Sequence, residues 1–143
     1  AGSLGWSFPA ALGAKCAAPG RKVVCWTGDG AFYYHLAELE TARRRGIPIV
    51  VVVNNNSGFG QGWPNLVKQA GNKVEAAEEL LRFGPTDFTA VAKSFGLTGI
   101  RVEKPHDVAP AIRAAMASGH TVVVDVVTDI EARAPAPWAP QEG

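Results

Sequence analysis

The chain has 143 residues, which suits a single domain, and 47% of them are hydrophobic, enough for a sizeable core. Its formal net charge of +1 gives no basis for a nucleic-acid partner, and no apolar run is long enough to span a membrane. The two cysteines, Cys16 and Cys25, lack the spacing of metal ligands, so we interpret both as reduced core thiols and expect a cytoplasmic protein. Because the chain opens in a glycine-rich segment without an initiator methionine, we expect it to be a domain of a longer polypeptide.

A helix and a strand are the first regular elements that the sequence predicts. Pro9 suits the start of a helix, because its missing N–H needs no partner there, and the helix is expected to end at Ala18. The small side chains of this stretch predict close packing against a neighbouring element. The β-branched run from Val23 to Thr27 is typical of a strand that is buried on both faces.

The next stretch predicts a turn, a helix and a second strand. A Gly-Asp-Gly turn at residues 28–30 ends the first strand. A helix is expected over residues 31–45, because apolar residues recur on one face, arginines fill the last turn and Gly46 can cap it. The second strand is expected over residues 47–53, and an asparagine-rich loop follows at 54–60. Since strands joined by a helix are usually parallel, the turn and the loop should share the carboxyl edge of one sheet, where open α/β sheets bind ligands.

The residue types at this edge suit a divalent metal ion together with a diphosphate. N–H groups at the start of the helix near Ala31 favour an anionic phosphate, whereas the carboxylate of Asp29 alone would repel it. A magnesium ion between the two resolves the conflict, because Mg²⁺ binds carboxylate, amide and carbonyl oxygens as well as phosphate. Asn56 offers an amide oxygen, and Gly58 offers a carbonyl that an unhindered backbone can turn inward.

The remainder of the chain predicts further elements of the same architecture. Helices are expected over residues 74–81, 85–95 and 106–117, and strands over residues 100–102 and 121–127. Thr86 is the predicted cap of the second of these helices, and Asp125, inside a β-branched strand, is expected to be paired or at the strand end. Together these elements predict an α/β fold, a three-layer sandwich with a mostly parallel sheet and helices on both faces. We assign residues 1–133 to this domain and the proline-rich residues 134–143 to a C-terminal arm.

At these residues the chain resembles the thiamine diphosphate-dependent enzymes, in the branch of decarboxylases and acetolactate synthases. That family carries a Gly-Asp-Gly motif, an intervening helix and strand, and then paired asparagines at the separation that Asp29 and Asn56 show here. The resemblance implies that Asp29, Asn56 and the carbonyl of Gly58 bind Mg²⁺. The contacts with thiamine diphosphate that it implies in this region are made by Gly28, Asp29, Gly30, Ala31, Asn56, Ser57, Gly58, Phe59 and Gly60.

The segment before the first helix also resembles this family. Gly2-Ser3-Leu4-Gly5-Trp6 is similar to the family's glycine–x–hydrophobic–glycine segment, which would make Gly2, Ser3 and Leu4 cofactor-binding residues. By this resemblance the Gly2 carbonyl would accept a hydrogen bond from the amine of the aminopyrimidine ring, and Leu4 would lie beneath the cofactor and keep it bent. Many acetolactate synthases carry methionine where Leu4 stands, which leaves the branch of the family open.

The function that the resemblance implies depends on a second domain. In this family a glutamate of a pyrimidine-binding domain, usually on a partner subunit, activates the cofactor, which then attacks 2-oxo acids. No glutamate of this sequence has a matching context, so the chain is expected to hold part of an active site in a homodimer or homotetramer.

Aromatic side chains are the candidates for contacts beyond the cofactor. Those expected to be covered by a partner are Trp6, Phe8, Tyr33 and Tyr34. Those expected either to face the substrate or to pack in a lid, together with one glutamine, are Phe59, Gln61 and Trp63.

Two other interpretations stay open. One is a nucleotide- or FMN-binding module, although the Gly28-x-Gly30 pattern continues to Tyr33 where a dinucleotide fingerprint needs glycine or alanine, and no P-loop lysine follows. The other is a non-catalytic interaction domain with a degenerate phosphate-binding site, against which Asp29 and Asn56 both argue.

Overall fold

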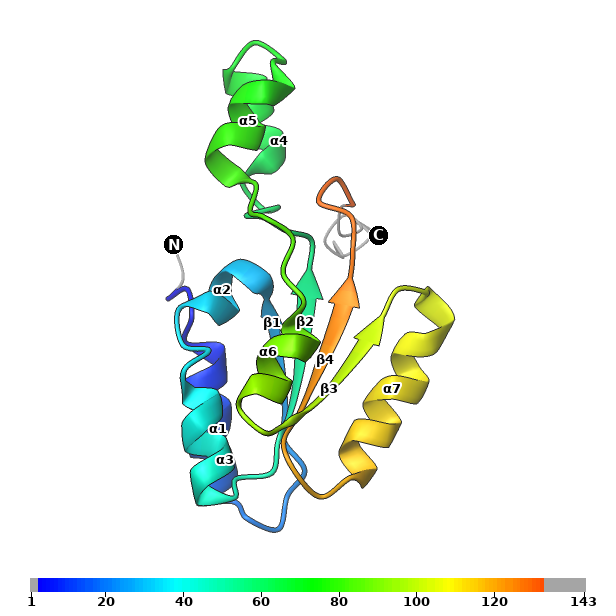
Figure 1. Ribbon diagram of the computed structural model, residues 1–143. Helices are drawn as coiled ribbons and strands as arrows, with labels where there is room; N and C mark the ends of the chain where they lie inside the picture. Colours follow the sequence, from blue (N-terminus) through cyan, green and yellow to red (C-terminus); the bar gives the residue numbers. More distant parts are fainter. Residues whose placement is uncertain (1–2, 133–143) are drawn as a thin grey trace, which may run out of the picture.

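The computed structural model describes residues 3–132, and in this part of the chain four parallel strands form one sheet (Figure 1). The strands are β1 (Val24–Gly28), β2 (Val50–Asn55), β3 (Thr98–Val102) and β4 (Val122–Val127), in the order β1-β2-β4-β3. Their parallel pairing confirms the predicted α/β fold. The predicted arm at 134–143 and the Gly2 carbonyl lie outside the described residues.

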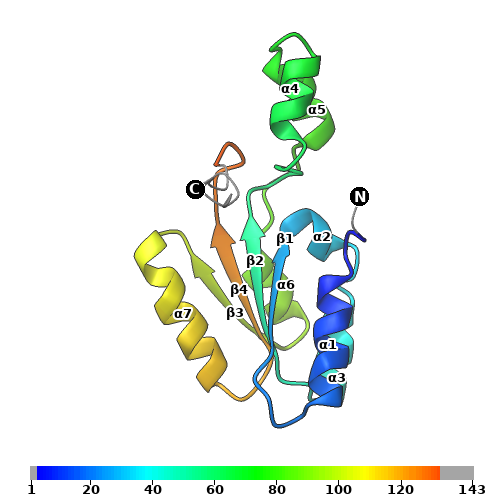
Figure 2. The same cartoon turned by 180° about the vertical axis from the view of Figure 1, so that it is seen from behind.

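Helices cover both faces of the sheet, as the sequence predicts (Figures 1 and 2). The helices are α1 (Ser7–Ala17), α2 (Asp29–Tyr33), α3 (Glu38–Arg45), α4 (Trp63–Gln69), α5 (Val74–Leu81), α6 (Phe88–Ser94) and α7 (Pro105–Ala117). One core joins α1, α2, α3 and α6 to one face of the sheet, and a second core joins α7 to the other face. Because side chains alternate along a strand, Val51 and Val53 enter the first core while Val50 and Val52 enter the second. Within the described residues no helix is long and apolar enough to cross a membrane.

The first strand differs from its prediction. Cys25 and Thr27 are buried, but Val24 is 43% exposed and Trp26 is 62% exposed, so the prediction that β1 is buried on both faces is wrong. The reason is that α7 packs on β2, β3 and β4. Cys16, which was also predicted to be a core residue, lies on the exposed side of α1.

The helix predicted over residues 31–45 is two helices. It starts earlier, at Asp29, and is interrupted between Tyr33 and Glu38. Hydrogen bonds from the His35 N–H to the Phe32 carbonyl and from the Glu38 N–H to the His35 carbonyl tighten the chain into i,i+3 turns there. Gly46 ends α3 in the left-handed conformation, as predicted.

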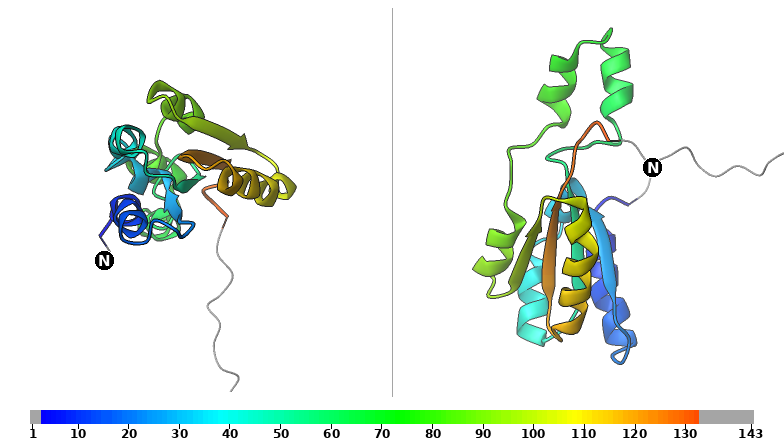
Figure 3. Two further views of the ribbon diagram at one scale, coloured as in Figure 1. Left: turned by 90° about the horizontal axis from the view of Figure 1, so that it is seen from below. Right: turned by 90° about the vertical axis from the view of Figure 1, so that its right-hand side faces the viewer.

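A helical hairpin of α4 and α5 stands beyond the carboxyl ends of the strands (Figures 1 and 3). The sequence predicts α5 but not α4, whose glycine- and proline-containing approach resembles a loop. The hairpin has its own small core, in which Trp63 and Ala77 pack against Ile130 from the segment after β4. This core joins the hairpin to the carboxyl edge of the sheet.

The start of α6 also corrects a prediction. Its cap is Asp87, whose carboxylate accepts hydrogen bonds from the N–H groups of Thr89 at 2.8 Å and Ala90 at 3.1 Å. Thr86, the predicted cap, hydrogen-bonds through its hydroxyl to the Tyr33 hydroxyl instead. This hydrogen bond therefore connects the segment before α6 with the end of α2.

Candidate functional site

A cavity of about 630 Å³ lies where β1 and β2 end, below the helical hairpin. We call this cavity the cradle. Of the predicted site residues, including the substrate-facing candidates, those that line it are Leu4, Gly28, Asp29, Gly30, Ala31, Asn56, Gly58, Phe59, Gly60 and Gln61. The register of the sheet explains this grouping, because Gly28 at the end of β1 lies opposite Asn54 in β2.

Some lining residues were missed and some predicted ones lie elsewhere. Asn54 and Asn65 line the cradle, and only Asn54 has a sequence signal, as the first residue of the asparagine run. Ser3 and Ser57 do not line it. Trp63 is buried in the core of the hairpin, which corresponds to the packing alternative for this residue.

Asp29 is the charged group of the cradle. It is the first residue of α2 and only 2% exposed. Its Oδ1 accepts a hydrogen bond from the Gly30 N–H at 2.7 Å, and its Oδ2 accepts one from the Gly58 N–H at 3.1 Å. Burial raises the pKa of Asp29 above its ordinary value, while these backbone N–H groups act in the opposite direction. The carboxylate is thus held by the two segments that form the cradle.

Asn56 points an oxygen at the same place. Its Oδ1 accepts a hydrogen bond from the Gly58 N–H at 3.1 Å, so the oxygens of Asn56 and Asp29 converge on one backbone amide. Ser57, between Asn56 and Gly58 in the sequence, has a φ of 56°, in the left-handed region that residues other than glycine seldom adopt. Such strained residues concentrate at functional sites.

Glycines let the segments that form the cradle pack closely, because side chains at these positions would collide with neighbouring atoms. A Cβ atom at Gly30 would lie 2.5 Å from the Phe59 ring, and one at Gly60 would lie 2.6 Å from Asn56 Nδ2. At Gly58 a Cβ atom would lie 2.6 Å from the Leu81 carbonyl oxygen. The walls of the cradle can therefore pack as they do only where these positions carry no side chain.

The three consecutive asparagines serve three different purposes. Asn54 Oδ1 accepts a hydrogen bond from the Thr128 hydroxyl at 2.7 Å. Asn55, on the opposite face of β2, is buried and donates to Asp125 Oδ1 at 2.8 Å, which confirms the expectation that Asp125 is paired. Asn56 lies beyond the strand and lines the cradle. Because side chains alternate along β2, Asn54 and Asn55 point to opposite faces of the sheet, whereas Asn56 lies after the end of the strand.

The oxygen atoms of the cradle fit a magnesium ion bound together with a phosphate. Among residues 3–132 no group of three or more histidine, cysteine, aspartate or glutamate side chains could hold a metal. One carboxylate, one amide oxygen and one backbone carbonyl instead leave coordination positions for phosphate oxygens and water, as Mg²⁺ requires. The carbonyl of buried Gly58 accepts no hydrogen bond from the described residues and would supply the third oxygen.

Exposed apolar side chains lie just before α1 and at the end of α2. Leu4 is 49% exposed, Trp6 68% and Tyr34 60%. Phe8, by contrast, is buried against Phe32, with ring centroids 5.2 Å apart. The predicted aromatic group is therefore divided, because Phe8 belongs to the core of the domain whereas Trp6 and Tyr34 face outward.

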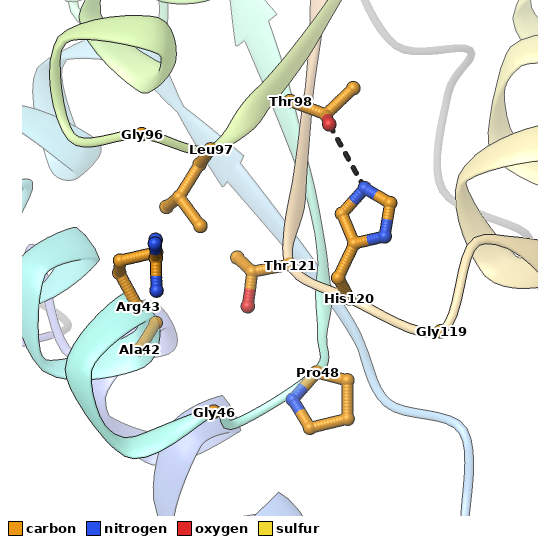
Figure 4. A pocket seen from close by; sticks show the side chains of 10 residues that line it. All are labelled: Ala42, Arg43, Gly46, Pro48, Gly96, Leu97, Thr98, Gly119, His120 and Thr121. Atoms are coloured by element: carbon orange, nitrogen blue, oxygen red, sulfur yellow. Dashed lines mark hydrogen bonds between the residues drawn. The ribbon is translucent and has the colours of Figure 1, made fainter.

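A second cavity, of about 370 Å³, lies at the opposite edge of the sheet (Figure 4). Three of its lining residues, Gly46, Gly96 and Gly119, follow the carboxyl ends of α3, α6 and α7. The carboxyl end of a helix carries partial negative charge, which suits the cation of Arg43 in this cavity but not a phosphate. The cradle is therefore the better candidate for an anionic ligand.

The fold and the cradle define a parallel α/β domain with a cavity at the carboxyl edge of its sheet. A family model described as the thiamine pyrophosphate enzyme, C-terminal TPP binding domain, matches residues 1–126. The chain belongs to this family, which confirms the resemblance inferred from its motifs; thiamine pyrophosphate is another name for thiamine diphosphate.

Individual relatives agree with this assignment. The chain is 39% identical over 127 residues to the acetolactate synthase of Bacillus subtilis (strain 168), covering 89% of this chain and 21% of the relative. It is 35% identical over 130 residues to the sulfoacetaldehyde acetyltransferase of Alcaligenes xylosoxydans xylosoxydans. That match covers 88% of this chain and 21% of the acetyltransferase. The chain thus spans about a fifth of the length of these curated relatives.

A solved structure shares the fold. The thiamine diphosphate-dependent 4-hydroxybenzoylformate decarboxylase of Rhodococcus jostii RHA1 superposes with a TM-score of 0.78 at 28% sequence identity. The match covers 88% of this chain and 23% of the decarboxylase chain.

Proposed function

We propose that this chain is the thiamine diphosphate- and Mg²⁺-binding domain of a 2-oxo acid decarboxylase or carboligase similar to acetolactate synthase. The observation that carries the proposal is the convergence of Asp29 Oδ2 and Asn56 Oδ1 on the Gly58 amide, at a cavity that all three residues line. Membership of the family supports the cofactor, and the donor set supports the metal.

Each part of the cradle has a role in this proposal. Asp29, Asn56 and the Gly58 carbonyl hold Mg²⁺, and the remaining backbone of residues 28–31 and 56–60 holds the diphosphate. Leu4 supports the middle of the cofactor from the rim of the same cavity. When bound, thiamine diphosphate supplies a carbon nucleophile and an electron sink for a 2-oxo acid substrate. The residues of the chain bind and orient this group and balance its negative charge.

The activating glutamate is assigned to a pyrimidine-binding domain of the same or another chain. Among the described residues no glutamate lines the cradle, which supports this assignment. The exposed side chains of Leu4, Trp6 and Tyr34, here called the rim patch, would pack against that domain in a homodimer or homotetramer. The proposal places the enzyme in the cytoplasm, which suits the two free cysteines.

Calorimetry of the full-length protein that contains this chain tests the cofactor site. Thiamine diphosphate is titrated with and without Mg²⁺ into wild-type protein and into the variants Asp29→Ala and Asn56→Ala. We expect binding that depends on Mg²⁺ in the wild type and is lost in Asp29→Ala, because the charged ligand to the metal is gone.

The control is Asp107→Ala, which removes an exposed carboxylate from α7. It should bind the cofactor as the wild type does. Equal affinity in Asp29→Ala and wild-type protein would overturn the assignment of the metal ligands.

A further inference from the structure

The carboxylate of Asp125 is the centre of a buried hydrogen-bond network behind the cradle. Asp125 lies on β4 and is 0% exposed. It accepts hydrogen bonds from Asn55 Nδ2 at 2.8 Å, from the Phe88 N–H at 3.2 Å and from Arg101 Nη1 at 2.9 Å. Moving a carboxylate out of water is so unfavourable that a buried ion pair often adds no stability over apolar packing. Two of its partners, Asn55 and the Phe88 N–H, belong to segments next to the cradle.

The first partner, Asn55, fixes the end of β2. Its Nδ2 donates to the Thr86 carbonyl at 2.9 Å as well as to Asp125, and its own carbonyl accepts from the Thr128 N–H at 2.9 Å. Both ends of this residue are therefore tied to neighbouring segments. The next residue is Asn56, whose oxygen faces the cradle. The position of Asn56 thus depends on the anchored residue before it.

The second partner of Asp125, the Phe88 N–H, connects it to the segment on the other side of the cradle. The Phe88 N–H that Asp125 binds belongs to the first residue of α6, directly after the segment that contains Thr86. The Thr86 hydroxyl hydrogen-bonds to the Tyr33 hydroxyl, and Tyr33 ends the short helix α2 that begins with Asp29. One buried carboxylate is therefore linked to both segments that carry the proposed metal ligands.

We propose that Asp125 is a positioning residue that sets Asn56 and α2, and so the oxygens of the cradle, in place through Asn55 and the segment from Thr86 to Phe88. This inference rests on the proposed function, because it assigns a purpose to a network behind the metal site. Residues that support metal ligands from behind typically account for a 10- to 100-fold difference in metal affinity.

The test measures the Mg²⁺ affinity of the full-length protein, from Mg²⁺ titrations of thiamine diphosphate binding followed by calorimetry. Asp125→Asn retains the size of the side chain but turns an N–H₂ group toward other donors, and Asn55→Ala removes the link to β2. Each is expected to weaken Mg²⁺ affinity about 10- to 100-fold. Because Asp125 acts through Asn55, the double variant should lose little more than the weaker-binding single variant.

A second readout needs no cofactor. Hydrogen exchange in the metal-free protein should be faster over residues 54–60 in Asp125→Asn than in the wild type, because the end of β2 is released. Tyr33→Phe retains the aromatic packing against Phe83 and Phe88 and removes only the hydroxyl. It should weaken Mg²⁺ affinity about threefold to tenfold, as the loss of one hydrogen bond would.

The matched control is Thr121→Val, at the opposite end of the same pair of strands. The buried Thr121 hydroxyl donates to the Ile47 carbonyl at 2.6 Å and so ties the start of β4 to the segment before β2. The Thr121 side chain lies at the second cavity (Figure 4). Its removal should lower stability while Mg²⁺ affinity stays within about twofold of the wild type, because this bond has no connection to the cradle.

Three outcomes would overturn the inference. The first is wild-type Mg²⁺ affinity in folded Asp125→Asn and Asn55→Ala, or, where these do not fold, in Tyr33→Phe. The second is an equal loss of affinity in Thr121→Val, which would mean that lower stability alone weakens the site. The third is the absence of Mg²⁺-dependent cofactor binding in the wild type, which would overturn the proposed function as well.

Discussion

The Gly58 amide donates a hydrogen bond to Asp29 Oδ2 at 3.1 Å, although the two residues are 29 positions apart in the sequence. The bond joins the turn after β1 to the loop after β2, which are the two walls of the cradle. It also leaves a buried carboxylate balanced only by backbone N–H groups, and burial raises the pKa of this carboxyl group. A bound cation would compensate that charge better than dipoles alone, which is why we expect the metal to be held here.

The glycine at position 60 offers a direct test of the shape of the cradle. A Cβ atom in Gly60→Ala would lie 2.6 Å from Asn56 Nδ2, so the amide has to move. We expect the affinity for Mg²⁺ with thiamine diphosphate to fall by about tenfold or more, as for the loss of a support behind a metal ligand. Calorimetry of the full-length protein measures the change. Gly84→Ala, where a Cβ atom meets nothing within 4 Å, should bind normally, and equal losses in the two variants would contradict the steric argument.

The chain by itself should not turn over a 2-oxo acid. With thiamine diphosphate and Mg²⁺ it supplies only the diphosphate side of the proposed site, because no described glutamate lines the cradle. We expect CO₂ release from pyruvate no faster than with the cofactor alone, whereas the full-length protein should be active on its own 2-oxo acid. Rapid CO₂ release by the purified 143-residue chain would show that the activating group lies within it.

The cap of α6 should make the local stability of this helix depend on pH. Asp87 accepts hydrogen bonds from the Thr89 side chain and from the N–H groups of Ala90 and Thr89, which lower its pKa below the ordinary 3.8. A lowered pKa means that the stabilisation is complete above this ordinary value and is lost as the pH falls through the lowered one. In Asp87→Ala the opening free energy of α6 at neutral pH should fall by about 1 kcal/mol.

Hydrogen exchange of the α6 amides measures this difference between variant and wild type. The difference should shrink only below about pH 4, where the wild-type carboxylate becomes protonated. Asp87→Asn is the control, since asparagine caps a helix about as well but carries no titrating charge. A difference between Asp87→Ala and the wild type that is the same at pH 7 and at pH 2 would contradict the role of the charged cap.

The rim patch should lie in the subunit interface. Trp6 and Tyr34 are 68% and 60% exposed in this domain, and aromatic side chains are enriched on surfaces that a partner covers. In the double variant Trp6→Gln with Tyr34→Gln the dissociation constant of the oligomer should rise more than about tenfold, because buried aromatic anchors dominate interface energies. Sedimentation of the full-length protein with cofactor measures the assembly. Leu80→Gln, which replaces an equally exposed apolar residue on α5, is the control, and unchanged assembly of the aromatic variant would place the interface elsewhere.

Local patterns in the sequence predict the architecture and the edge of the sheet at which the candidate site lies. The β-branched runs of β2 and β4, the Gly-Asp-Gly turn and the asparagine run are local patterns, and local patterns specify strands, turns and the edge at which parallel strands end. These patterns therefore predict that Asp29 and Asn56 lie at the same edge, and both line the cradle. The resemblance to the family rests on the same two residues and their spacing, and the match of the family model over residues 1–126 shows the membership.

Features that depend on contacts between distant segments cannot be predicted from local patterns. The exposed face of Trp26 reflects where α7 lies, and a strand's own sequence does not record which helix covers it. The tie between Asn55 and Asp125 spans 70 residues, and the link of Thr86 to Tyr33 spans 53. A side chain such as Thr86 has several possible partners along the chain, and packing selects one of them because a buried polar group has to find its hydrogen bond among the atoms that the fold brings near.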